Sequence, residues 1–202
     1  ITVMEPSIFK QMAAEMEQEG LSANTQASRE WFFEKIEEMA DLKPSRQQLK
    51  QHYPIAKRQI IGQMFMFFYS PLTKNQLPYY DRFPLIILLE AQKDTFMGLN
   101  LHYLPIDLRQ ELYYRLLPRA TTSVFNNFTR LRIDYSFLKS RRSLRAFKPC
   151  VKRYRYDQMI GKMANVPANE WELTIHLPLA LFRKASQERV YKDSRIIARR
   201  IT

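Results

Sequence analysis

The spacing of hydrophobic residues predicts two short helices at the start of the chain. In "SIFKQMAAEMEQEG", residues Ile8, Met12 and Met16 recur at every fourth position, and Gly20 follows as a stop signal. The next segment, "TQASREWFFEKIEEMADLKP", repeats such a stripe and ends at Pro44. Residues 1–44 are therefore predicted to form a helical arm.

The hydrophobic period changes after residue 58. Three segments then have patterns typical of strands. "IIGQMFMFFYS" is rich in aromatic residues, "PLIILLE" is continuously apolar, and "TFMGLNLHYLP" alternates between large apolar and smaller or polar residues. We expect them to form a small, strongly bent antiparallel sheet over about residues 60–104, a half-barrel of SH3-like size. Alternation along residues 64–69 places Met64, Met66 and Phe68 on one face and Phe65, Phe67 and Tyr69 on the other. Because both faces are apolar, both must be covered.

Helices are predicted again beyond the sheet. "IDLRQELYYRLL" begins after Pro105 and stops before Pro118, and a second helix is predicted over residues 121–138. A third is predicted near "VPANEWELTIHLP", with Asn169 as its cap, and "SQERVYKDSRIIARR" is helical in composition. The fold class is therefore α+β, with an arm at residues 1–44 and a single body at 58–202.

Charge is divided unevenly between arm and body. The net charge is +12, yet residues 1–41 contain nine acids and three basic residues. Residues 1–41 thus carry −6 and the remaining residues +18. This asymmetry favours contact of the arm with its own body or with a neighbouring subunit, and makes binding of a polyanion the second alternative.

Several kinds of chemistry are excluded by composition. Cys150 is the single cysteine, so the chain contains no internal disulfide and no thiolate-rich metal site. Three isolated histidines (His52, His102 and His176) and four glycines offer neither a metal motif nor a phosphate-binding loop. We expect no cofactor, no metal and no enzymatic activity.

A nuclease would need clustered carboxylates near a lysine, and the nearest approach is Asp81, Glu90, Lys93 and Asp94. The longest apolar run, at residues 85–89, is too short to span a membrane. The chain does not begin with methionine, and we expect that a leader preceded Ile1.

One segment concentrates positive charge. Its basic residues are Arg141, Arg142, Arg145, Lys148, Lys152, Arg153 and Arg155. Phe147, Tyr154 and Tyr156 are interleaved with them, which suits phosphate neutralisation combined with stacking. The alternatives are a solvated face or a partner for acidic arms.

An aromatic motif forms the second candidate site. Its residues are Phe65, Phe67, Tyr69, Tyr79, Tyr80, Phe83, His102 and Tyr103. Two interpretations apply: a strand core joined by a connection that Pro71, Pro78 and Pro84 stiffen, or an exposed platform, centred on Tyr79, Tyr80 and Phe83, for a partner or for stacked bases.

Several blocks of the chain carry a family resemblance. They are "GQMFMFFYSPLTKNQLPYYDRFPLIILLE", "GLNLHYLP", "FKPCVKRY", "EWELTIHLP" and "VYKDSRIIARR". In this order they resemble virion-associated proteins of T4-like tailed phages, over about residues 61–200 and without the acidic arm. Members are described as DNA end protectors or head-completion proteins, others as tail or baseplate components.

The resemblance implies a non-enzymatic component of the virion, assembled in the host cytoplasm. Its partners would be other virion proteins in a symmetric multi-subunit assembly. It would dock there as a component of the tail or baseplate, or of the head–tail completion structure. The alternative is a protein that binds the termini of double-stranded DNA without reading sequence. No membrane partner is expected.

Overall fold

The computed structural model describes residues 8–38, 46, 50, 53–140 and 142–201. Within these residues the helices are α1 (Ile8–Gln18), α2 (Gln26–Glu38), α4 (Ile106–Leu116), α5 (Tyr135–Ser140), α6 (Arg142–Arg145), α7 (Trp171–His176) and α8 (Gln187–Ile201). The strands are β1 (Met64–Tyr69), β2 (Tyr80–Asp81), β3 (Leu85–Ala91), β4 (Thr95–Asn100), β5 (Val151–Arg155), β6 (Met159–Val166) and β7 (Phe182–Arg183). The predicted α+β class is confirmed.

A five-stranded antiparallel sheet in the order β5-β4-β3-β1-β6 forms the centre of the molecule. The register shifts between β1 and β6 and between β3 and β4, and such bulges bend a sheet. The Arg155 N–H donates to Tyr69 Oη at 3.2 Å, although β3 and β4 lie between their strands. The sheet is therefore bent, as predicted, without closing into a barrel.

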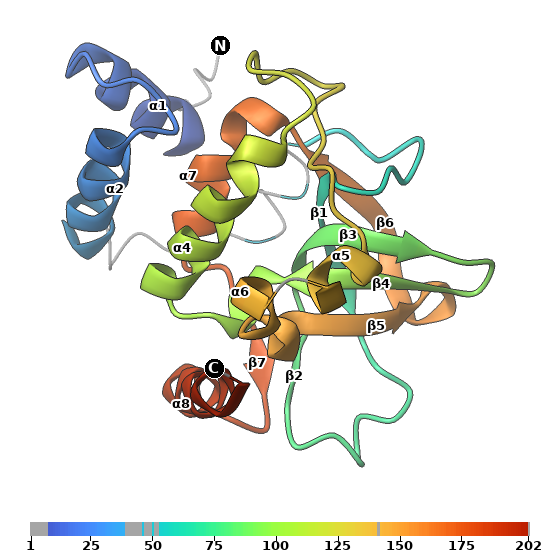
Figure 1. Cartoon of the computed structure of the whole chain (residues 1–202). Coiled ribbons are helices and arrows are strands. Elements are labelled where there is room, and N and C mark those ends of the chain that lie inside the picture. The colour runs from blue at the N-terminus through green and yellow to red at the C-terminus, as the bar shows by residue number, and fades with distance from the viewer. Residues whose placement is uncertain (1–7, 39–45, 47–49, 51–52, 141, 202) are drawn as a thin grey trace, which may run out of the picture.

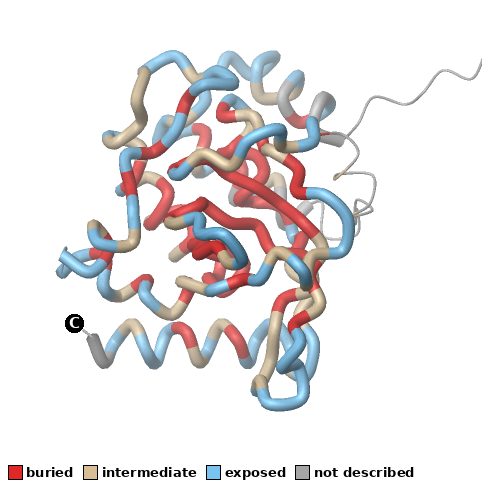
Figure 2. The backbone as a smooth tube through the Cα atoms, turned by 90° about the vertical axis from the view of Figure 1, so that its right-hand side faces the viewer, coloured by how far each residue is buried: buried red, intermediate tan, exposed pale blue. Residues whose placement is uncertain are grey.

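Both faces of β1 are covered, as its alternation predicts. Met64 and Met66 point into the larger core cluster, to which α4 contributes Leu112. Phe65 and Phe67 point into a second cluster on the concave side of the sheet. The strands at the centre of Figure 2 are accordingly coloured as buried.

Edge-to-face aromatic contacts fill the second cluster. The Phe67 ring lies 5.4 Å from Phe96 and 5.2 Å from Tyr154, and Tyr69 lies 5.0 Å from Tyr154. Such geometry is the favourable one for aromatic rings. Two of the aromatic side chains interleaved in the basic segment are thus core residues, Tyr154 in this cluster and Phe147 in the larger one, so neither is available for stacking on a ligand.

The acidic arm packs against the body. Met12 and Phe32 belong to the larger core cluster, and Phe32 stacks on His176 of α7 at 4.7 Å. Ser28 Oγ donates to Glu172 Oε1 of α7 at 2.8 Å. Figure 1 shows α1 and α2 beside α4 and α7, at the side of the molecule remote from β5. The predicted arm boundary at Pro44 lies outside the described residues.

Three sequence predictions were wrong. The predicted helix over residues 121–138 does not form before Asp134, and residues 121–134 are a loop. The helix begins only with α5, where Asp134 accepts a hydrogen bond from Phe137 N at 2.7 Å and so caps the first turn. The sheet extends beyond residue 104, since β5 and β6 join it. Asn169 does not cap α7, whose N-cap position is Glu170.

The predicted helices after Pro105 and at the C-terminus are confirmed as α4 and α8. Helix α8 lies along one side of the molecule, where buried and exposed turns alternate in Figure 2. It is held by Val190, which is fully buried, and by Ser194 Oγ, which donates to the Tyr103 carbonyl at 2.7 Å.

Candidate nucleic-acid interface

Positive charge gathers around α5. Residues 119–148 contain eight basic residues and a single acid, Asp134. Two open clefts flank the helix: one of about 680 Å³ includes Arg130 and Arg132, and one of about 330 Å³ includes Lys139, Arg145 and Lys148. We call the described basic residues of this region the basic face: Arg119, Arg130, Arg132, Lys139, Arg142, Arg145 and Lys148.

The side chains of the basic face are oriented by local contacts. The Arg119 guanidinium lies 4.0 Å from the centroid of the Phe137 ring, and Lys139 Nζ lies 4.3 Å from that of Tyr135. No ion pair joins Arg130, Arg132, Lys139 or Lys148 to any residue in the described part of the chain. Their charges are therefore available to an external anion.

The sequence-predicted basic residues do not all lie on this face. Arg142, Arg145 and Lys148 do, whereas Arg141 lies outside the described residues. The other three are on the edge strand β5. We therefore treat the helical part and the strand part of the segment separately.

On β5, each basic residue has an internal partner. Arg155 forms an ion pair with Asp157, through hydrogen bonds of 2.9 and 2.5 Å. Lys152 lies 4.1 Å from the centroid of the Tyr103 ring, and burial lowers its pKa. Arg153 is exposed but contacts Thr95 and Met97. These three charges are less available to a ligand than those around α5.

Sequence reasoning missed Arg119, Arg130, Arg132 and Lys139. Part of the signal was present, since the segment "RLRIDYSFLKSRR" contains five basic residues in thirteen, against seven in fifteen for residues 141–155. Reading residues 121–138 as one helix placed Arg130 and Arg132, which are two positions apart, on different sides of that helix. The loop instead brings Arg130 and Arg132 to the side of α5.

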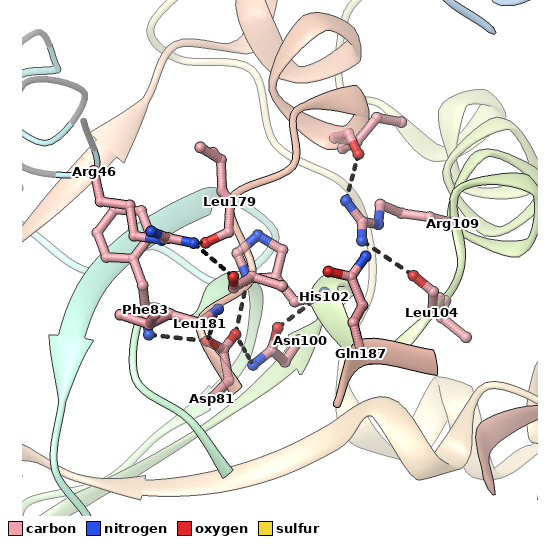
Figure 3. A network of polar contacts seen from close by, with 12 residues as sticks. Arg46, Asp81, Phe83, Asn100, His102, Leu104, Arg109, Leu179, Leu181 and Gln187 are labelled. Atoms are coloured by element: carbon pink, nitrogen blue, oxygen red, sulfur yellow. Dashed lines mark hydrogen bonds and ion pairs between the residues drawn. The ribbon is translucent and has the colours of Figure 1, made fainter. Parts of the chain in front are cut away.

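The aromatic motif is largely buried, and two of its residues, Phe83 and His102, belong to a buried polar network (Figure 3). Phe65, Phe67, Phe83 and His102 are fully buried, Tyr69 and Tyr103 nearly so, and only Tyr79 and Tyr80 are partly exposed. Phe83 therefore cannot belong to an exposed platform.

Asp81 is the centre of this network. Its carboxylate accepts hydrogen bonds from Phe83 N at 2.9 Å, Leu181 N at 3.1 Å, Asn100 Nδ2 at 3.2 Å and His102 Nδ1 at 2.8 Å. The blocks "LPYYDRFP" and "GLNLHYLP" meet here, together with the segment before β7. Asp81 thus joins three parts of the chain that are far apart in sequence.

The pKa values of both Asp81 and His102 are shifted. Burial by itself raises the pKa of the Asp81 carboxyl, but His102 and the two backbone N–H donors outweigh burial and lower it. Burial also lowers the pKa of His102, despite the attraction of Asp81. His102 Nε2 is buried without a hydrogen-bond partner, which suits a neutral ring with its proton on Nδ1.

The carboxylates proposed for a nuclease do not converge. Asp81 lies near Asn100, at the end of β4, whereas Glu90 and Asp94 flank the opposite, exposed turn between β3 and β4. In the described part of the chain, no three His, Cys, Asp or Glu side chains are grouped as a metal site would require. None of the described helices has the length and apolar character needed to cross a membrane.

Comparison with known proteins gives one family. No curated protein and no solved structure matches the chain. A family described as phage T4 terminal DNA protecting protein matches residues 3–200, which extends the resemblance over the acidic arm as well. This description favours the DNA-terminus alternative over the tail or baseplate role that the sequence first suggested. The chain belongs to the phage T4 terminal DNA protecting protein family.

Proposed function

We propose that this protein binds the ends of double-stranded DNA through the basic face and shields them, acting by occupancy and not by catalysis. The observation that carries the proposal is the set of basic side chains gathered around α5 in a chain of a DNA-protecting family. Phosphate neutralisation by Lys and Arg supplies most of the affinity of sequence-independent DNA binding. The protein would thus be a virion component located at a DNA terminus.

The interior of the protein supports a role without chemistry. Asp81 and His102 are closed to solvent and hydrogen-bonded to each other within the fold. The clefts beside α5 are open and lined by cations, with Asp134 as the one acid, and its carboxylate is engaged by Ser136 and the Phe137 N–H. The basic face therefore offers an anion-binding surface without a general base.

The proposal is tested by the salt dependence of binding to a short blunt duplex. In the triple variant Lys139→Ala, Arg145→Ala, Lys148→Ala, the slope of log K against log salt concentration should fall by about 2 to 3, because each phosphate that a cation neutralises adds about 0.9 to it. A matched control removes three exposed lysines far from α5: Lys74→Ala, Lys93→Ala, Lys162→Ala. This control variant has the same net charge as the first triple variant, and its slope of log K against log salt concentration should stay near that of the wild type.

Protection is measured separately, as the rate at which an exonuclease shortens linear duplex DNA. Wild-type protein and control variant should slow the digestion, and the triple variant should not. Absence of wild-type binding at about 50 mM salt, where phosphate-driven affinity is strong, would reject the proposed function. Equal slopes for the two triple variants would reject the basic face as the binding surface.

A further inference from the structure

An aromatic side chain projects from the loop that precedes α5. Residues 120–131 form a loop closed by a bridge between Ala120 and Leu131, with Arg132 N donating to the Arg119 carbonyl at 2.8 Å. It is the yellow-olive loop at the top of Figure 1. Phe128 is 87% exposed, more than any other large hydrophobic side chain in the described residues. Leaving a phenylalanine in water forgoes about 2 kcal/mol of burial, which a partner that covers the ring would recover.

Hydrogen bonds inside the loop fix its shape. Thr129 is 1% exposed, and its Oγ1 accepts from Asn126 N at 2.9 Å and donates to the Val124 carbonyl at 3.3 Å. Asn126 Oδ1 accepts from Phe128 N at 2.9 Å. On the inner side, Phe125 packs edge-to-face on Trp171. The backbone is thus braced while the Phe128 ring points away from the core.

The loop is also anchored to the sheet. Leu131 N donates to the Gly62 carbonyl at 2.9 Å, just before β1. The buried side chain of Gln63 donates from Nε2 to the Asn127 carbonyl at 3.2 Å and accepts from Asn165 of β6 at 3.0 Å. The Phe128 tip is therefore held at a fixed place relative to the body, which reduces the entropy cost of binding.

Charge around the loop selects the kind of partner. Residues 119–133 include Arg119, Arg130 and Arg132 and no acid. Arg130 and Arg132 line the cleft at the base of the loop, beside Phe137. An exposed aromatic ring next to arginine side chains suits a ligand that has a flat apolar surface bordered by phosphates. Duplex DNA presents such a surface only at its end, where the outer face of the terminal base pair is unstacked.

We propose that Phe128 stacks on the terminal base pair of duplex DNA while Arg130 and Arg132 bind the phosphates next to it. This inference rests on the proposed function and explains how ends would be distinguished from duplex interiors, because phosphate contacts alone do not make that distinction. Base stacking on an aromatic side chain tolerates any sequence, since every base has a π face.

The test compares a blunt linear duplex with a dumbbell of equal length whose ends are closed by hairpin loops. Wild-type protein should prefer the linear duplex. Phe128→Ala should weaken linear binding by about 5- to 150-fold, the effect of removing one stacked aromatic ring, and leave dumbbell binding unchanged. Phe128→Trp should retain the preference, and its indole fluorescence should be quenched by the linear duplex and not by the dumbbell.

Leu72→Ala is the matched control, because Leu72 is 69% exposed on the loop between β1 and β2. It should bind both DNAs like the wild type. Both alanine variants should unfold with the wild-type midpoint, since neither side chain is buried.

The outcomes separate the two proposals. If Phe128→Ala keeps the preference for linear DNA and the same salt slope, stacking is overturned while DNA binding stands. Equal wild-type affinity for both DNAs also overturns stacking. If the wild type binds neither DNA, the proposed function fails and this inference fails with it. Unchanged DNA binding with loss of Phe128→Ala protein from phage particles would assign the tip to a protein neighbour instead.

Discussion

Gly62 and Leu131 meet through their backbones, and a β-carbon built on Gly62 would lie 1.9 Å from the Leu131 carbonyl oxygen. Gly62 also has φ +87°, a conformation that side chains with a β-carbon rarely adopt. The start of β1 and the end of the Phe128 loop can therefore approach each other only because residue 62 is glycine.

Gly62→Ala is expected to lower the free energy of unfolding by about 3 kcal/mol, as both the clash and the backbone strain must be relieved. Gly20→Ala is the matched control. Gly20 has φ +70° but nothing within 4 Å of its added β-carbon, so only the strain of about 1 kcal/mol applies. Urea denaturation measures both; equal losses would contradict the close approach.

Asp81→Asn should destabilise the protein by about 3 kcal/mol, the typical cost of breaking a buried charged network. The amide that replaces one carboxylate oxygen would confront N–H donors such as His102 Nδ1 and Asn100 Nδ2. Asp157→Asn, in an exposed ion pair with Arg155, should unfold nearly like the wild type. Wild-type stability of Asp81→Asn in chemical denaturation would show that the network contributes little.

Stability should fall as the pH is lowered from 6.5 to 4 because of His176. Burial lowers the pKa of this histidine from 6.5 to about 4. In its neutral form Nδ1 donates to the Glu172 carbonyl and Nε2 accepts from Gln110 Nε2, an arrangement that a second ring proton would break. Arg109 opposes protonation further.

Between these pH values the unfolded chain binds a proton at this site that the folded protein does not, so the unfolding free energy should drop by about 3 kcal/mol in total. His102, whose pKa is also lowered, acts in the same direction. Denaturation at several pH values checks this, and His176→Asn should flatten the curve. An unchanged slope in that variant would mean that His176 is protonated in the folded state.

Cys150 should be unreactive in the folded protein. The thiol is fully buried, and burial raises its pKa to about 12, so almost no thiolate forms at pH 8. A disulfide reagent should release no chromophore under native conditions and one equivalent in denaturant. Rapid native labelling would contradict the burial of Cys150.

The sequence predicts those parts of the fold that depend on the local periodicity of hydrophobic residues. Met64 to Tyr69 alternate between two apolar clusters, and Pro105 opens α4 as expected. Strand β5 was missed because Lys152, Arg153 and Arg155 were interpreted by charge and not by alternation, although Tyr154 marks the buried side. Pairing of β5 with β4 is non-local and has no signature within the strand itself.

Only the residue composition of the candidate site could be predicted from the sequence, and not its arrangement in space. A run of arginines and lysines indicates anion binding, yet which of them share a surface depends on the loop that Thr129 and Gln63 hold in place. The exposure of Phe128 has no sequence signal either, because "SVFNNF" contains two phenylalanines and only Phe125 packs inward. Asp81 and His102 likewise meet through tertiary contacts alone.

The acidic arm has a consequence for how the protein meets a polyanion. Helices α1 and α2 and the region around α5 lie on different sides of the molecule, with seven acids and three basic residues in residues 8–38 against one and eight in residues 119–148. This separation gives the protein an acidic side and a basic side, and hence an electric dipole. The electric field of a polyanion exerts a torque on this dipole and turns the α5 side of the protein toward the polyanion before collision. Productive encounters therefore become more frequent, most of all at low ionic strength.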